Sequence, residues 1–279
     1  MDENKRRRAV RKSRSTVKII LIVLCVILLC VFLYSGYKII TTLRGYKLAE
    51  QAYTAAANSY ATVVSPTPAP QASAVPEENP QPQGDGIDPE VSPLNIDFNG
   101  LRSQNADIAA WIYGPNSVIN YPIAYTEDNF YYLDHMYNGE MNANGTIFID
   151  CRNASDFSDQ NTCIYGHNMN DGSMFASLRS YRDESYYPEH KVLYLSTPYF
   201  NYRIDLIAGF VTEPTSFAYA PNFDSPEQFM GHIQLIRDLS TFKSDVEVSE
   251  TDHIVTLSTC TYERDDGRYV VVGKLTRIH

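Results

Sequence analysis

The longest apolar run in the chain covers residues 19–34 and directly follows a strongly basic segment. Val17, the aliphatic stem of Lys18 and residues up to Ile40 extend it to about the 20 residues that a membrane-spanning helix needs. Residues 1–50 contain 11 basic and 3 acidic side chains, most of the basic ones before the run. Because basic flanks stay in the cytoplasm, the pattern predicts a cytoplasmic tail over 1–16, a single-pass cell-membrane anchor over 17–40 and an extracellular remainder. A cleaved signal peptide is the alternative, but the run lacks a convincing small-residue cleavage site.

Two segments of different composition follow the predicted anchor. Residues 41–64 are rich in Ala and have Tyr46, Tyr53 and Tyr60 seven positions apart, which predicts a helical juxtamembrane stalk. Residues 65–93 are rich in Pro and poor in apolar side chains, which is typical of an extended, disordered linker. Residues 94–279 are long and apolar enough to form one domain with a hydrophobic core.

Short alternating or apolar runs between turn residues predict eight strands in this domain. They cover residues 109–113, 118–124, 146–150, 162–165, 191–197, 202–211, 253–259 and 269–277. Helices are expected over 96–104, 128–134, 174–182 and 225–239, the last with a start signal at Ser225, Pro226 and Glu227 and an apolar face. The pattern predicts an α+β fold that is mainly β, an eight-stranded closed or nearly closed barrel with a few peripheral helices.

Charge changes the picture of possible partners. Residues 51–279 contain 12 basic and 30 acidic side chains, so this part carries a formal charge near −18. Such a surface is soluble and repels nucleic acid and anionic lipid, and no nucleic-acid partner is expected. The N-terminal basic cluster, read alone, is also typical of a nucleic-acid tail, but beside a membrane span topology explains it better.

Candidate chemistry is concentrated in the last predicted strand pair. The strand over 253–259 leads into Cys260, and Asp266-Gly267 supplies a turn before Arg268 opens the next strand. A hairpin of this kind places the thiol beside the guanidinium, which lowers a thiol pKa and can stabilise an oxyanion. The best candidate for a proton shuttle is His167, at the junction between a strand and a polar loop.

Less reactive roles exist for each of these residues. Three of the five cysteines, Cys151, Cys163 and Cys260, follow the span; this number is odd, so one thiol is free or pairs with another chain. Cys151 and Cys163 either form a disulfide or are small buried side chains. Together with His167 they match no zinc spacing, and no metal or cofactor is expected. Arg268 has a surface ion pair as its alternative, although an exposed pair contributes little stability.

Several motifs together resemble the class B sortases, the cysteine transpeptidases of Gram-positive cell surfaces. They are TLSTC with Arg268 eight residues after Cys260, YGHN around His167, and the segments DNFYYL and GTIFIDCRN. The resemblance extends over residues 94–279 and implies a sortase-type barrel with a helix between strands six and seven. It implies catalytic roles for Cys260, His167 and Arg268, and sorting-peptide contacts for Asn129, Leu133, Tyr165, Thr215, Tyr219 and Ser258. Thr261 departs from some relatives, which have an acidic residue after the nucleophile.

The reaction implied by the resemblance is transpeptidation at a C-terminal sorting signal of a secreted protein. Cys260 attacks the Thr carbonyl of an LPXTG or NPQTN type motif, and the acyl group passes to an amine of peptidoglycan or a pilin. Two alternatives are a cell-wall or papain-like cysteine peptidase and a non-catalytic module that binds wall peptides. In the papain type the nucleophile opens a helix and precedes its His, whereas here His167 precedes Cys260 and the Cys ends a strand.

Overall fold

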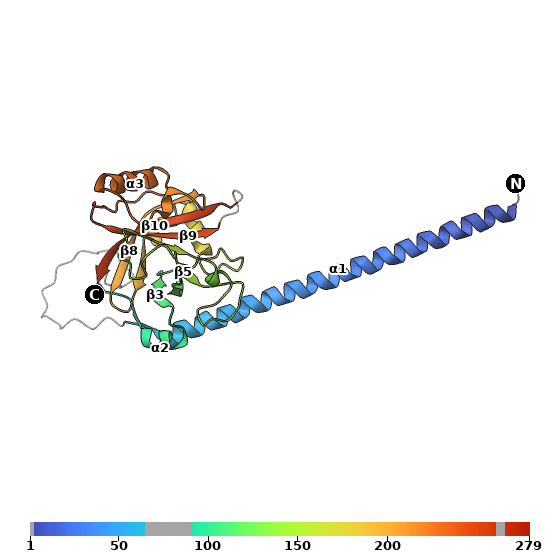
Figure 1. Ribbon diagram of the computed structural model, residues 1–279, viewed down its shortest axis with the longest axis horizontal. Coiled ribbons are helices and arrows are strands. Elements are labelled where there is room, and N and C mark those ends of the chain that lie inside the picture. Colours follow the sequence, from blue (N-terminus) through green and yellow to red (C-terminus); the bar gives the residue numbers. More distant parts are fainter. Residues whose placement is uncertain (1–2, 65–90, 261–265) are drawn as a thin grey trace, which may run out of the picture. The chain divides into compact units, whose positions relative to one another are not determined.

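The computed structural model describes residues 3–64, 91–260 and 266–279 (Figure 1). The chain divides into two compact units, Met1–Leu48 and Ala49–His279. Helix α1 (Glu3–Tyr60) begins in the first unit and ends in the second. Within the described residues, its part from Ile20 onward is the one helix whose length and apolar composition suit a membrane span. This is compatible with a single-pass anchor.

All eight strands predicted for the domain are present and close into one barrel. They are β3 (Ile108–Tyr113), β4 (Asn120–Ala124), β5 (Ile147–Ile149), β6 (Asn161–Tyr165), β7 (Val192–Ser196), β8 (Asn201–Thr212), β9 (His253–Cys260) and β10 (Arg268–Ile278). Their order around the barrel is β10-β8-β7-β3-β4-β5-β6-β9. Neighbouring strands are antiparallel except for the pairs β4–β5 and β6–β9, which are parallel. The predicted fold class is therefore confirmed.

Strand β10 has apolar side chains at successive positions because both of its faces are buried. Tyr269 and Val271 belong to the main hydrophobic core, whereas Val270 and Val272 belong to a second core that includes residues of α3 (Pro226–Asp238). A strand that is covered on both faces needs apolar side chains on both faces. Helix α3 lies in the chain between β8 and β9, the sixth and seventh barrel strands (Figure 1).

The other predicted helices are shorter or tighter than expected. Helix α2 covers Phe98–Gln104, with Asp97 capping its N-terminus through the Gly100 N–H. The segments expected to be helical over 128–134 and 174–182 are 3₁₀ helices instead, η1 (Tyr131–Leu133) and η2 (Ala176–Arg182). In the first, the Asp128 carboxylate accepts two backbone N–H groups, a local pattern that ends after one turn. Two further 3₁₀ turns, η3 (Tyr187–Glu189) and η4 (Phe217–Tyr219), were not predicted.

The last turns of α1 pack on the barrel as part of the second unit. Ala49, Tyr53 and Ala56 are buried, and the Tyr53 hydroxyl donates to the carbonyl of Gly145 at 2.5 Å. Beyond the helix, β1 (Ala61–Val63) pairs with β2 (Leu94–Ile96). Residues 49–64, the larger part of the stalk predicted over 41–64, thus belong to the same compact unit as the barrel, and the domain boundary at residue 94 stays a prediction. Most of the predicted linker, residues 65–90, lies outside the described residues.

Candidate active site

The site is assembled at the ends of three barrel strands. β6 and β9 run parallel, with Tyr165 opposite Ser258, so both strands end at the same edge of the barrel. In the antiparallel pair β9–β10, Cys260 is directly opposite Arg268. The predicted hairpin is present, and its strand pairing brings Cys260 and Arg268 together as expected. The side chain of Cys260 lies outside the described part of the chain, as does Thr261.

A cavity of about 360 Å³ opens at this edge. Seven of the nine candidate residues line it, namely Asn129, Leu133, Tyr165, His167, Tyr219, Ser258 and Arg268. Of the other two, Cys260 contributes the adjacent backbone, and Thr215 is exposed beside the lining residue Pro214. The cavity lining also includes five described residues that were not candidates from the sequence, Phe130, Phe148, Gly166, Pro214 and Thr259.

The loop that carries His167 is fixed by backbone contacts. The Gly166 N–H donates to the Ser258 carbonyl at 3.0 Å, and the Phe175 N–H donates to the His167 carbonyl at 3.0 Å. A Cβ at Gly166 would lie 2.7 Å from the Phe175 ring, so this close approach requires glycine. His167 Nε2 lies 2.7 Å from the Leu133 carbonyl oxygen. Because a carbonyl only accepts, Nε2 carries a proton in this arrangement.

Arg268 is held by its own turn. Its Nη1 donates to the carbonyls of Asp266 at 3.0 Å and of Gly267 at 3.1 Å. Asp266 has a positive φ of 57°, a conformation that Asp and Asn adopt more readily than most residues. The partly exposed guanidinium reaches the cavity and retains further N–H groups that can donate.

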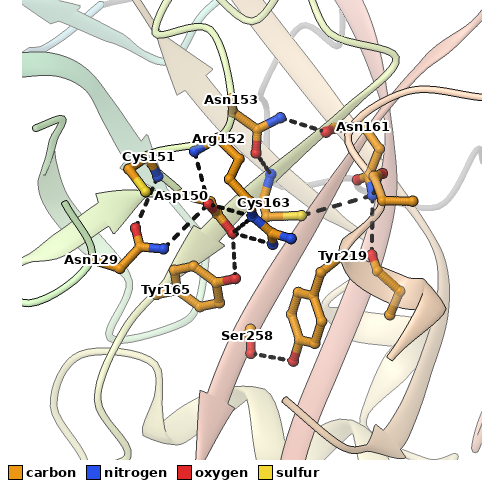
Figure 2. A network of polar contacts seen from close by, with 12 residues as sticks. Asn129, Asp150, Cys151, Arg152, Asn153, Asn161, Cys163, Tyr165, Tyr219 and Ser258 are labelled. Carbon is orange, nitrogen blue, oxygen red and sulfur yellow. Dashed lines mark hydrogen bonds and ion pairs between the residues drawn. The ribbon is translucent and has the colours of Figure 1, made fainter. Parts of the chain in front are cut away.

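Aromatic and polar side chains form the wall below these groups. The rings of Tyr165 and Tyr219 lie 5.8 Å apart, and the hydroxyl groups of Tyr219 and Ser258 share a hydrogen bond of 2.9 Å. Behind Tyr165 lies the buried carboxylate of Asp150, which also contacts Asn129 and Arg152 (Figure 2). Burial alone would raise the pKa of Asp150, but hydrogen bonds from Arg152, Tyr165 and Asn129 lower it to about 2.

The other two cysteines of the domain, Cys151 and Cys163, are not among the described residues that line the cavity. Cys163 is fully buried, and burial raises its pKa to about 12, so it is unreactive at neutral pH. Cys151 is half-buried, and both thiols are free. This decides between the two alternatives for the pair: the sulfur atoms form no disulfide. Within the described residues, no group of three His, Cys, Asp or Glu side chains is arranged to hold a metal ion.

Comparison with known proteins supplies independent evidence. The Sortase domain family matches residues 115–276. Sortase B of Listeria monocytogenes is 39% identical over 181 residues, which cover 64% of this chain and 74% of that protein. A Bacillus anthracis structure described as similar to sortase B has a TM-score of 0.66 at 34% identity, covering 84% of this chain and 98% of that one. The Staphylococcus aureus sortase B–substrate complex has a TM-score of 0.62 at 30% identity, covering 65% and 85%.

Proposed function

Since this chain belongs to the sortase family and is a cysteine transpeptidase of class B type, we propose that it joins secreted proteins to the cell surface. Its substrate is a C-terminal sorting signal of the LPXTG or NPQTN type, cleaved after Thr. The acyl acceptor is an amine of a peptidoglycan cross-bridge or of a pilin. The observation that carries the proposal is the register of β9 and β10, which places Arg268 opposite Cys260 at the edge where His167 emerges.

The proposed chemistry has two acyl transfers. The Cys260 thiolate attacks the Thr carbonyl carbon, and the guanidinium of Arg268 stabilises the negative charge that develops on the oxygen. His167, as imidazolium, gives its proton to the departing amine, and a thioacyl enzyme remains. An incoming amine then attacks the thioester, His167 accepts a proton from it, and the Cys260 thiolate leaves. The product is a new amide, with thiolate and imidazolium restored.

The cavity supports recognition of an extended peptide. Its lining combines the apolar and aromatic side chains of Leu133, Tyr165 and Tyr219 with two polar residues, Asn129 and Ser258. A few polar groups among apolar walls fix the orientation of a bound ligand. We assign peptide-binding roles to these five residues. Thr215 is exposed beside the cavity lining, where a longer peptide reaches it.

The proposal includes a place in the cell. The apolar part of α1 anchors the chain in the cell membrane as a single pass, with the basic N-terminal segment in the cytoplasm. The catalytic domain is then outside, where sorting signals of secreted proteins arrive. Its acidic surface keeps it soluble and away from anionic lipid headgroups.

Mass spectrometry tests the reaction. The full chain in detergent micelles is incubated with LPXTG-type and NPQTN-type peptides and short amine nucleophiles, beside a Cys260→Ala control. We expect cleavage after Thr, transfer to the amine and a thioacyl adduct that the control lacks. Cleavage without transfer in the presence of every amine would favour the peptidase alternative. A folded protein whose Cys260 is alkylated by thiol reagents but that forms no adduct would favour the binding module.

A further inference from the structure

Asp150 follows β5 directly and is fully buried behind the candidate site, outside the set of residues that line the cavity. We propose that Asp150 is a positioning residue: its carboxylate fixes the side chains of Tyr165 and Asn129 and so sets where the sorting peptide lies on the cavity wall. This inference rests on the proposed function of the cavity. It adds a residue that touches neither the peptide nor the reacting atoms.

Two side chains that line the cavity donate hydrogen bonds to this carboxylate. The Tyr165 hydroxyl donates to Oδ2 at 2.6 Å, and the Asn129 amide nitrogen donates to Oδ1 at 3.3 Å (Figure 2). Tyr165 ends β6, whereas Asn129 belongs to the loop between β4 and β5. The carboxylate therefore links two segments that are 36 positions apart and form different parts of the wall.

The amide of Asn129 is fixed at both ends. Its oxygen accepts the backbone N–H of Cys151 at 2.9 Å, while its nitrogen faces Asp150. An exchange of oxygen and nitrogen would place two acceptors together on one side and two donors together on the other. The surroundings of Asp150 thus determine which group Asn129 has left to offer a bound peptide.

The carboxylate is held in its ionised form. The guanidinium of Arg152 donates to this carboxylate from Nη2 to Oδ2 at 2.5 Å and from Nε to Oδ1 at 3.0 Å. The backbone N–H of Arg152 donates to Oδ1 at 2.9 Å. An ionised carboxylate only accepts, so the hydroxyl proton of Tyr165 must point toward Asp150 and away from the peptide. Tyr165 then presents its ring face and oxygen lone pairs to the cavity, in one orientation.

Stability alone does not explain this arrangement. The Asp150 side chain is 1% exposed and that of Arg152 is 55% exposed, so the charge of Asp150 has lost its water almost completely. Apolar side chains of similar volume commonly stabilise a protein as well as a buried ion pair does. A buried carboxylate that accepts from two cavity residues is instead well suited to define their geometry, and Tyr165 in turn packs against Tyr219.

The test compares Asp150→Asn with Asp159→Asn, which changes a second carboxylate that accepts several hydrogen bonds. Asp159 also accepts hydrogen bonds from asparagine side chains, Asn153 and Asn222, and from the N–H of Ala154, but none of these lines the cavity. We expect Asp150→Asn in the full chain to raise the KM for the sorting peptide about 10-fold, with kcat changed less than about 3-fold. Asp159→Asn should lower the thermal midpoint and leave KM unchanged. A purely structural role for Asp150 predicts the same behaviour for both variants.

Tyr165→Phe tests whether Asp150 influences the KM through the hydroxyl group of Tyr165. It removes only the hydroxyl and leaves Asp150 paired with Arg152. If Asp150 acts through Tyr165, the increase in KM for the double variant is smaller than the product of the two single increases. A KM for Asp150→Asn within about 2-fold of wild type, or fully multiplicative effects, would overturn the proposal.

A second readout is independent of activity. With ¹³C-labelled tyrosine rings, the resonances of Tyr165 are identified by their absence in Tyr165→Phe. We expect them to shift and broaden in Asp150→Asn but not in Asp159→Asn. Unchanged resonances would refute the positioning role whether or not the wild type turns over a peptide. Wild-type protein without activity, combined with displaced Tyr165 signals, would instead count against the proposed function alone.

Discussion

Arg268 shows at the scale of a single residue how a short turn can prepare a charge for chemistry. Two of its contacts are with carbonyls of its own turn, which orient the guanidinium without linking it to a distant element. A lysine in its place would keep the charge but lose the planar group of donors. The structure therefore permits a test in which charge and geometry are separated.

We expect Arg268→Lys to lower kcat/KM for the transpeptidation about 100-fold or more, because removal of one oxyanion donor typically costs this much. The free energy of unfolding should change by less than about 1 kcal/mol, since the side chain is partly exposed. Peptide turnover and urea unfolding measure the two effects. Arg203→Lys is the control, because Arg203 pairs with Asp205 on β8. Activity of Arg268→Lys within 3-fold of the control would refute a specific role for the guanidinium.

Gly166 connects packing to the position of His167. Gly166→Ala places a methyl group against the ring of Phe175, so either the ring or the His167 loop must move. We expect a loss of about 1–3 kcal/mol in stability and a fall in kcat that exceeds the unfolded fraction. Gly231→Ala in α3 is the matched control, because nothing lies within 4 Å of its added Cβ. That change should be neutral or stabilising. Full activity in Gly166→Ala would show that the loop does not depend on this contact.

At the scale of elements, α3 contains a histidine that makes the stability of the domain sensitive to acid. His232 is buried between the rings of Phe217 and Phe223, and burial lowers its pKa to about 4. Below pH 6.5 the unfolded chain binds a proton there that the folded chain does not bind. Stability is therefore lost as the pH falls from about 6.5 toward 4.

We expect this histidine to account for about 2–3 kcal/mol of the stability lost between pH 7 and pH 4.5. Urea unfolding of His232→Leu at the two pH values should show a loss smaller by that amount than in the wild type. His253→Asn, which changes an exposed histidine, should behave like the wild type. Equal losses in all three proteins would mean that His232 titrates normally.

The same elements show what the sequence can and cannot predict. Each barrel strand was predictable because the alternation of apolar and polar residues, or the apolar run, lies within the strand itself. The pairing of Cys260 with Arg268 was predictable because both residues belong to one hairpin. The parallel pairing of β6 with β9 joins segments about 90 positions apart, and no local pattern encodes it. Asp150 was missed because Tyr165 and Asn129, the cavity residues that it contacts, lie on other segments of the chain and only Arg152 is close to it in sequence. The signal available was an Asp-Cys-Arg segment directly after an apolar strand.

The whole molecule combines an apolar helix with an acidic domain, and this predicts how each part behaves in cells. The full chain should remain in the membrane fraction after alkaline extraction, whereas a chain beginning at residue 49 should be soluble. Protease added to intact protoplasts should digest the domain of the full chain, because in the proposed topology the basic segment is cytoplasmic and the domain is outside. Protection of the domain until the cells are lysed would reverse the proposed orientation.

The last turns of α1 and strand β1 should contribute to the stability of the domain. Tyr53 is buried against Tyr121 and Tyr137, and its hydroxyl contacts Gly145 and Thr146 beside β5. A chain that begins at residue 94 loses this contact and the β1–β2 pairing, so we expect it to be clearly less stable than one that begins at 49. Tyr53→Ala in the longer chain should by itself cost about 3–5 kcal/mol.

Urea unfolding of the three proteins, with peptide turnover at low temperature, separates stability from function. The edge of the barrel that carries the candidate site is formed by β6, β9 and β10, and no residue of α1 is among the described residues that line its cavity. The shorter chain and Tyr53→Ala should therefore retain kcat wherever they are folded. If both chains unfold at the same urea concentration, the final turns of α1 contribute nothing to the domain, and the stalk predicted for residues 41–64 is an independent element.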